Sequence, residues 1–137
     1  MSNPDIVATV LQHLGTLPDI CLVIGSNDAV CEAFIDPSRM DFRVDGASIT
    51  MENGPWHIHL DATKVHQITF AVTPDTAHGG ASQMSYSMRL FDALGAALLR
   101  AFFLAMYDAQ GQVRAERVQQ YEALRARGGG QDSIVLT

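Results

Sequence analysis

The chain has 137 residues, of which 47% are hydrophobic and 18% are charged, and its formal net charge at pH 7 is −6. This length and composition are typical of one globular domain that builds its core without disulfides or metals. Nine lysines and arginines against fifteen acids argue against nucleic acid as a partner, because phosphate contacts supply most of the non-specific affinity for nucleic acids.

The sequence also predicts no membrane association. It contains no apolar run of about 18 residues, the length that a membrane-spanning helix requires. The N-terminal segment lacks the basic start and the small-residue cleavage site of a secretory signal, so we expect a cytoplasmic protein. Cys21 and Cys31 lie in apolar runs and are interpreted as buried thiols, not as a metal or redox pair.

The first element in chain order is a helix, predicted over residues 4–14, where apolar side chains recur at helical spacing. Asn3 is the expected N-cap, Pro4 suits the first helical position, and Gly15 ends the pattern. Apolar or alternating runs separated by turn residues then predict strands at residues 20–25, 30–35, 39–45, 47–52, 56–60, 65–72 and 83–91.

Residues 95–107 are ambiguous by sequence. Their alanine and leucine content favours a helix, whereas their position one short turn after a strand favours a hairpin partner. We favour the strand. Residues 110–127 are predicted as a helix with Val118 and Tyr121 facing inward.

The C-terminal residues 128–137 begin with three glycines and are expected to form a flexible tail. Residues 1–127 are expected to form one domain. Helices on either side of a run of strands indicate an α+β fold with a mostly antiparallel sheet.

Three segments, in their order, resemble the haem-utilisation proteins of the HemS, ChuX and HutX kind. They are VIGSNDAVCEAF, PWHIHLDATKVHQITFAV and SYSMRLFDALGAALLRAFF, and they extend over about residues 20–107. The first loosely matches the family's VGN turn, and the second matches its histidine-bearing strand and the strand that follows. The third places Phe91, Asp92, Gly95 and Phe102 at the positions that the family's hairpin expects.

The resemblance implies a split-barrel-like antiparallel sheet with flanking N- and C-terminal helices, and a strand at GAALLRAFFL. It also implies that a single-module member pairs as a homodimer. Two family features are missing here. AVCEAFID holds no histidine where the long members carry an axial ligand, and FLAMYDAQ stands where the family has a basic segment.

Three of the five histidines lie in the short segment ENGPWHIHLDATKVH. On an extended strand, Trp56, Ile58 and Leu60 share one face, and His57 and His59 share the other. The rise of a strand places these two side chains about 7 Å apart. Two imidazoles on one face are compatible with three interpretations.

The first interpretation is haem binding. His57 or His59 would ligate the iron, and Arg89 or Arg100 would meet a propionate, because a guanidinium matches the geometry of a carboxylate. The expected lining of the apolar slot is Met84, Met88, Phe102 and Phe103.

The second interpretation is a small metal-dependent enzyme in which His57, His59 and His66 bind one zinc, iron, nickel or copper ion. The third is a dimeric protein of the same fold that has lost its ligand. No nucleophile or nucleotide motif occurs in the sequence. We therefore predict a haem-binding or haem-trafficking homodimer and favour a carrier over an enzyme.

Overall fold

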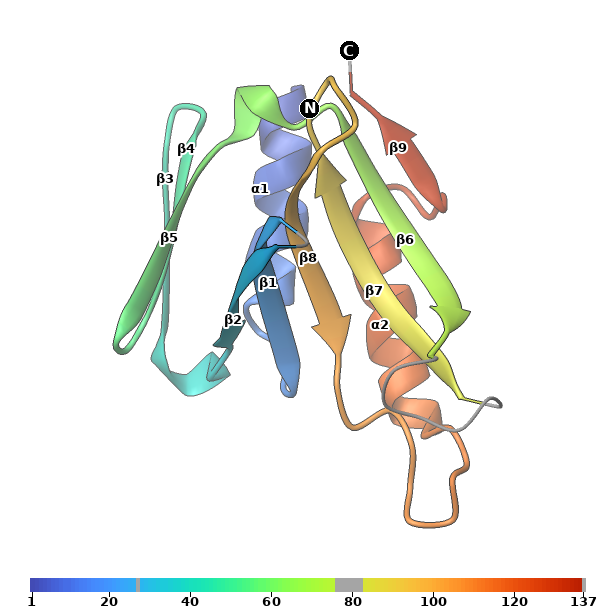
Figure 1. The fold of residues 1–137 in the computed structure, drawn as a ribbon. Coiled ribbons are helices and arrows are strands. Elements are labelled where there is room, and N and C mark those ends of the chain that lie inside the picture. The colour runs from blue at the N-terminus through green and yellow to red at the C-terminus, as the bar shows by residue number, and fades with distance from the viewer. Residues whose placement is uncertain (27, 76–82, 137) are drawn as a thin grey trace.

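The computed structural model describes residues 1–26, 28–75 and 83–136. Within them the chain forms two antiparallel β-sheets and two α-helices (Figure 1). The larger sheet has six strands in the order β2–β1–β8–β7–β6–β9, and the smaller has three in the order β3–β4–β5. The expected α+β fold with mostly antiparallel sheets is confirmed.

The larger sheet combines strands from both ends of the chain, whereas the smaller sheet is one continuous meander. The larger sheet contains β1 (Ile20–Ser26), β2 (Ala29–Phe34), β6 (Gln67–Pro74), β7 (Met84–Phe91), β8 (Ala97–Phe103) and β9 (Ser133–Val135). The smaller sheet contains β3 (Met40–Asp45), β4 (Ser48–Asn53) and β5 (Trp56–Asp61). Single-turn helices at Pro37–Arg39 and Ala62–Lys64 precede and follow this meander.

Helix α1 (Asn3–Leu14) begins one residue earlier than the periodicity predicts. Its N-cap is Ser2 and not Asn3. The Ser2 hydroxyl accepts a hydrogen bond from the backbone of Asp5 at 3.3 Å, and the Asp5 carboxylate accepts one from the backbone of Ser2 at 3.0 Å. This reciprocal pair satisfies two amide groups at the start of the chain.

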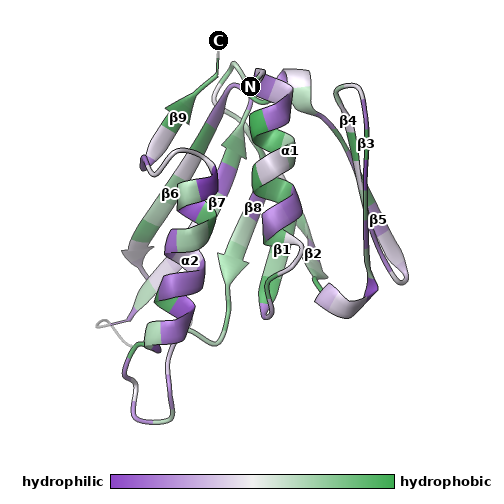
Figure 2. Cartoon of the chain, turned by 180° about the vertical axis from the view of Figure 1, so that it is seen from behind, coloured by the Kyte–Doolittle hydropathy of each residue, from purple (hydrophilic) through white to green (hydrophobic). Residues whose placement is uncertain are grey.

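Both helices pack on the same face of the six-stranded sheet (Figure 2), and the buried side chains of α1 are all apolar. Helix α2 (Ala115–Arg127) runs beside α1. The shared core contains Val10, Leu11 and Leu14 of α1, Leu22, Met88, Leu90, Leu99 and Ala101 of the sheet, and Tyr121 and Leu124 of α2. No helix in the described residues is long and apolar enough to cross a membrane.

Strand β8 resolves the ambiguity at residues 95–107 in favour of the hairpin. It pairs with β7 on one side and with β1 on the other. Leu99, Ala101 and Phe103 alternate into the core. Two neighbouring strands satisfy the backbone of β8 along both edges, and this tertiary context outweighs the helical propensity of its leucines and alanines.

The end of the chain differs from the expected flexible tail. Residues Ser133–Val135 form β9 against β6, with Ile134 opposite Ile68. Leu136 is 4% exposed. The physical reason is the short apolar run IVL, which follows the glycines and pairs with the otherwise free edge of β6.

Arg117 of α2 is a charged residue that is only 1% exposed. The hydrophobic periodicity of the sequence does not predict this burial. Its guanidinium donates hydrogen bonds to the carbonyl oxygens of Pro18 at 2.9 Å, Asp19 at 3.0 Å and Leu104 at 2.9 Å. A further bond of 2.6 Å runs to the side chain of Gln120. One side chain therefore joins α2 to the start of β1 and to the end of β8.

Two backbone corners at this junction adopt left-handed conformations without glycine. Asp19 has a φ of 54° and Ala105 a φ of 53°, and such residues cost about 1 kcal/mol or more each. The carbonyl of Asp19 accepts from Arg117, and that of Ala105 accepts from Arg114 at 3.0 Å. The two arginines thus stabilise the corners that the fold requires.

We predict that Arg117→Met lowers the free energy of unfolding by about 3 kcal/mol, because the hydrogen bonds from a buried guanidinium to three backbone carbonyls are lost. Urea denaturation of both proteins measures the difference. Arg127→Met is the matched control, since Arg127 is exposed on the same helix, and its effect is expected within about 0.5 kcal/mol. Equal losses in the two variants would contradict the assigned role of Arg117.

Candidate functional site

The six-stranded sheet has an open face, opposite the helices, that no described helix or strand covers (Figure 1). Residues directly opposite each other in antiparallel strands point to the same face. One such row runs from Glu32 of β2 through Val23, Arg100 and Arg89 to Thr69 of β6. Five strands, drawn from both halves of the chain, thereby contribute to one line of side chains on this face.

The adjacent row on the open face is mostly apolar. It runs from Phe34 of β2 through Cys21, Phe102 and Ser87 to Ala71 of β6. Phe34 is 59% exposed, whereas Cys21 is 5% exposed. The open face therefore presents aromatic and aliphatic surface directly beside two positive charges.

Arg89 and Arg100, called the arginine pair below, are directly opposite each other on β7 and β8. The guanidinium of Arg89 lies 6.0 Å from the ring centre of Phe102, and its Nε donates to Ser87 Oγ at 3.3 Å. Among the described residues, no carboxylate forms a salt bridge with either arginine. Like charges opposite each other destabilise a sheet, so this pair suits an anionic ligand that would neutralise it.

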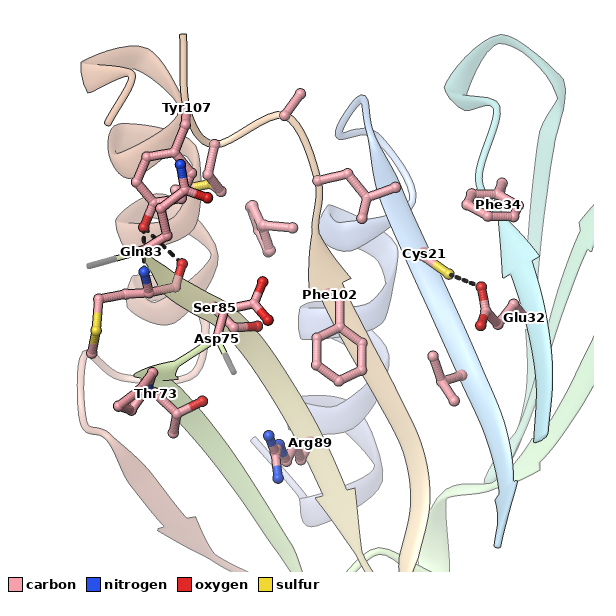
Figure 3. Close-up of a pocket in the computed structure, with 17 residues that line it drawn as sticks. Cys21, Glu32, Phe34, Thr73, Asp75, Gln83, Ser85, Arg89, Phe102 and Tyr107 are labelled. Atoms are coloured by element: carbon pink, nitrogen blue, oxygen red, sulfur yellow. Dashed lines mark hydrogen bonds between the residues drawn. The ribbon is translucent and has the colours of Figure 1, made fainter. Parts of the chain in front are cut away.

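A pocket of about 670 Å³ opens on this face, a size suited to a cofactor-sized ligand. Figure 3 shows Cys21, Glu32, Arg89, Phe102 and Tyr107 around it. Its wall also includes the segment 104–107 that follows β8. Arg89 lines the pocket, and Arg100 lies between Arg89 and the lining residue Val23 in the charged row.

Two hydrogen bonds join Tyr107, in the pocket wall, to Met84, the first residue of β7. Its hydroxyl accepts a hydrogen bond from the backbone N–H of Met84 at 2.6 Å and donates one to the carbonyl of Met84 at 2.7 Å. Both hydrogen-bonding roles of the phenol are thus occupied by the backbone.

Cys21 is a buried thiol in the lining of the pocket. Its Sγ lies 3.9 Å from a carboxylate oxygen of Glu32 (Figure 3). Burial raises the pKa of the Cys21 thiol above its usual value, and the negative charge and hydrogen bond of Glu32 raise it further. Cys21 is therefore a neutral thiol near neutral pH, and Cys31, expected to be buried, is exposed instead.

The histidine pair of β5 lies on the outer face of the three-stranded sheet. His57 and His59 are exposed, and their ring centres are 5.0 Å apart. Glu52 is opposite His57 and Thr50 is opposite His59, with Thr50 Oγ1 2.9 Å from His59 Nδ1. The predicted alternation of this strand is correct, but the structure does not bring these imidazoles together with the arginine pair.

A small cavity that His59 borders does not change this conclusion. It measures about 160 Å³ and is lined almost entirely by apolar side chains. A pocket for a drug-sized or larger ligand measures roughly 300–1,000 Å³, so this cavity is too small for a tetrapyrrole. We therefore leave the histidine pair out of the site developed below.

Two other predicted contributions need correction. Met88, expected to line the haem slot, is fully buried on the helix-covered face, because strand alternation turns it away from Arg89, whereas the other expected residues, Met84, Phe102 and Phe103, do line the pocket. The described residues contain no group of three or more histidines, cysteines or acids that could hold a metal ion. The structure thus gives no support to a metal site of His57, His59 and His66.

Sequence reasoning did not identify Cys21, Glu32, Phe34 or Tyr107 as site residues. The only available signal for the first three was the period of two in β1 and β2, which places alternate residues on one face. Tyr107 belongs to the segment after β8, whose position depends on the folded arrangement of α2.

Comparisons with known proteins agree with the family resemblance seen in the sequence. A family model matches residues 8–127. ChuX has a TM-score of 0.71 at 15% identity, covering 94% of this chain and 76% of its own. The heme-binding protein PhuS from Pseudomonas aeruginosa, in its holo form, has a TM-score of 0.65 at 14% identity over 89% of this chain and 33% of its own.

ChuS, an E. coli heme oxygenase, has a TM-score of 0.62 at 13% identity over 90% of this chain and 35% of its own. This chain therefore spans about a third of PhuS and ChuS. At these identities the structural similarities establish the fold alone. No curated protein matches the sequence.

We predict that Cys21 reacts with a thiol reagent at least about tenfold more slowly than Cys31 near neutral pH, because it is buried and protonated. The two rates are measured on Cys31→Ser and Cys21→Ser, each of which retains one cysteine. Glu32→Gln, combined with Cys31→Ser, should accelerate the reaction of Cys21 by removing the neighbouring charge. Equal rates for the two thiols would refute this description of the pocket.

Proposed function

Because this chain belongs to the ChuX/HemS-like family, we propose that it binds haem on the open face of the six-stranded sheet. The observation that carries the proposal is the arginine pair, which has no carboxylate partner among the described residues and lies beside Phe102 at the edge of a 670 Å³ pocket. The family membership suggests the ligand, and the geometry of the pair suggests its location.

The chemistry of these side chains fits a tetrapyrrole. Haem has a flat apolar ring and two carboxylates, so a site requires an apolar surface with cations at one edge. Phe34 and Phe102 supply exposed or half-buried aromatic surface in one row, and Arg89 and Arg100 supply the cations in the next. Guanidinium groups match carboxylates through paired hydrogen bonds.

The proposed activity is carriage of haem within the cytoplasm, without a chemical step. An open sheet face permits a ligand to be loaded and released without prior opening of a closed cavity. Of the residues selected by sequence, Met84, Arg89, Phe102 and Phe103 line the pocket and Arg100 lies directly opposite Arg89. Cys21, Glu32 and Phe34 join them at the pocket. The protein is proposed to act as a homodimer, as the family resemblance implies.

We predict that Arg89→Gln and Arg100→Gln each weaken haem binding about tenfold, the effect of losing one charge-assisted hydrogen bond. Without ligand, each variant should be more stable than the original by up to about 0.5 kcal/mol, because the repulsion between the two arginines disappears. Soret titrations and urea denaturation measure the two quantities. The combination of weaker binding and greater stability distinguishes a ligand site from a structural role.

Two controls accompany these variants. Arg43→Gln removes an exposed guanidinium from the other sheet and should leave the titration unchanged. The double variant His57→Ala/His59→Ala should also bind haem as the original does, since its imidazoles lie on the outer face of the smaller sheet. If the histidine variant loses haem binding while both arginine variants bind haem normally, the haem site does not lie at the arginine pair.

The proposed homodimer generates a separate prediction. Val30 and Phe34 of β2 are 51% and 59% exposed on the open face, and an apolar edge of this kind favours association. We expect a dimer in sedimentation velocity at micromolar concentration, and a monomer for Val30→Glu. Val44→Glu, at a position of similar exposure on β3, should remain dimeric. A monomeric original protein would disprove the assembly.

A further inference from the structure

We infer that the site recognises the carboxylates and the ring of its ligand and not a central iron, so that metal-free and iron porphyrins bind with similar affinity. The inference rests on the proposed function, because it concerns the same arginine pair and pocket.

The described imidazoles lie away from the pocket. His57 and His59 belong to the outer face of the smaller sheet, and His66 precedes β6 at the opposite end of that strand from the pocket residue Thr73. His13 belongs to α1, on the helix-covered face, where burial lowers the pKa of its ring. The described lining of the pocket therefore contains no imidazole, the side chain that would ligate haem iron most strongly.

The other candidate ligands are held in forms that bind iron weakly. Cys21 is a protonated thiol, whereas the thiolate is the form that ligates metals. The phenol oxygen of Tyr107 is already engaged in two hydrogen bonds with the backbone of Met84, at 2.6 and 2.7 Å. Met84 and Met106 also line the pocket, but their neutral thioethers are soft ligands that suit soft metal ions better than ferric iron.

The groups that do face the ligand recognise charge and shape. Residues directly opposite each other in an antiparallel pair have Cα atoms about 5 Å apart, so the arginine pair offers two neighbouring guanidiniums. The two propionates of protoporphyrin leave one edge of the ring and present the complementary pair of charges. The row of Phe34, Cys21 and Phe102 then runs parallel to the charged row and provides contact for the ring.

The test compares three ligands on the full-length protein: haemin, metal-free protoporphyrin IX and its dimethyl ester. Quenching of Trp56, the only tryptophan, provides the same readout for all three. We expect haemin and the metal-free acid to bind with dissociation constants less than tenfold apart. The ester should bind at least about tenfold more weakly, because it cannot pair with guanidinium.

A preference for haemin of more than tenfold over the metal-free acid overturns the inference and leaves the proposed function standing. Failure of all three ligands to bind overturns the proposed function and the inference with it. If the dimethyl ester binds as tightly as the metal-free acid, the arginine pair does not recognise the carboxylates of the porphyrin.

Absorption spectra of the haemin complex provide a second measurement, using Cys21→Ser, His57→Ala/His59→Ala and His78→Ala. His78 lies outside the described residues and is therefore tested as well. An unchanged Soret maximum in all variants supports recognition without an iron ligand from these groups. A shift of the maximum in any one of them identifies an axial ligand and overturns the inference.

Discussion

The hydrogen bonds from Arg117 to three backbone carbonyls are the interaction on which the rest of this structure depends. They join α2 to the corner before β1 and the corner after β8, where Asp19 and Ala105 adopt left-handed backbone conformations. These strands carry Cys21 and Phe102, and the second corner continues into the pocket wall. A buried guanidinium on the helix-covered face thereby determines the shape of the site on the opposite face.

The two faces of the large sheet are under different physical constraints. On the helix-covered face, burial selects apolar side chains such as Leu22 and Met88. On the open face, nothing in the described chain neutralises the arginine pair, and the sheet tolerates a repulsive cross-strand contact. A local departure from the most stable arrangement at a concave, partly apolar surface is typical of a binding site, and it is the physical basis of the proposed haem site.

The histidines illustrate the limit of motif reasoning in this protein. The strand at 56–61 and the outward direction of His57 and His59 follow from a period of two and are correct. Whether an outward direction leads to a cavity or to solvent depends on which sheet the strand joins. Because β5 pairs with β4 in a separate sheet, the imidazoles and the arginine pair belong to different surfaces.

The sequence by itself determined most elements, the α+β class and the family, because hydrophobic periodicity and turn residues act locally. It also selected Arg89, Arg100 and Phe102 through the resemblance. Only the tertiary structure decided that the two arginines are directly opposite each other, that Arg117 is buried, and that β9 closes the sheet edge. The reason is that register and strand order arise from pairing between distant segments, whose backbone hydrogen bonds carry no local sequence signal.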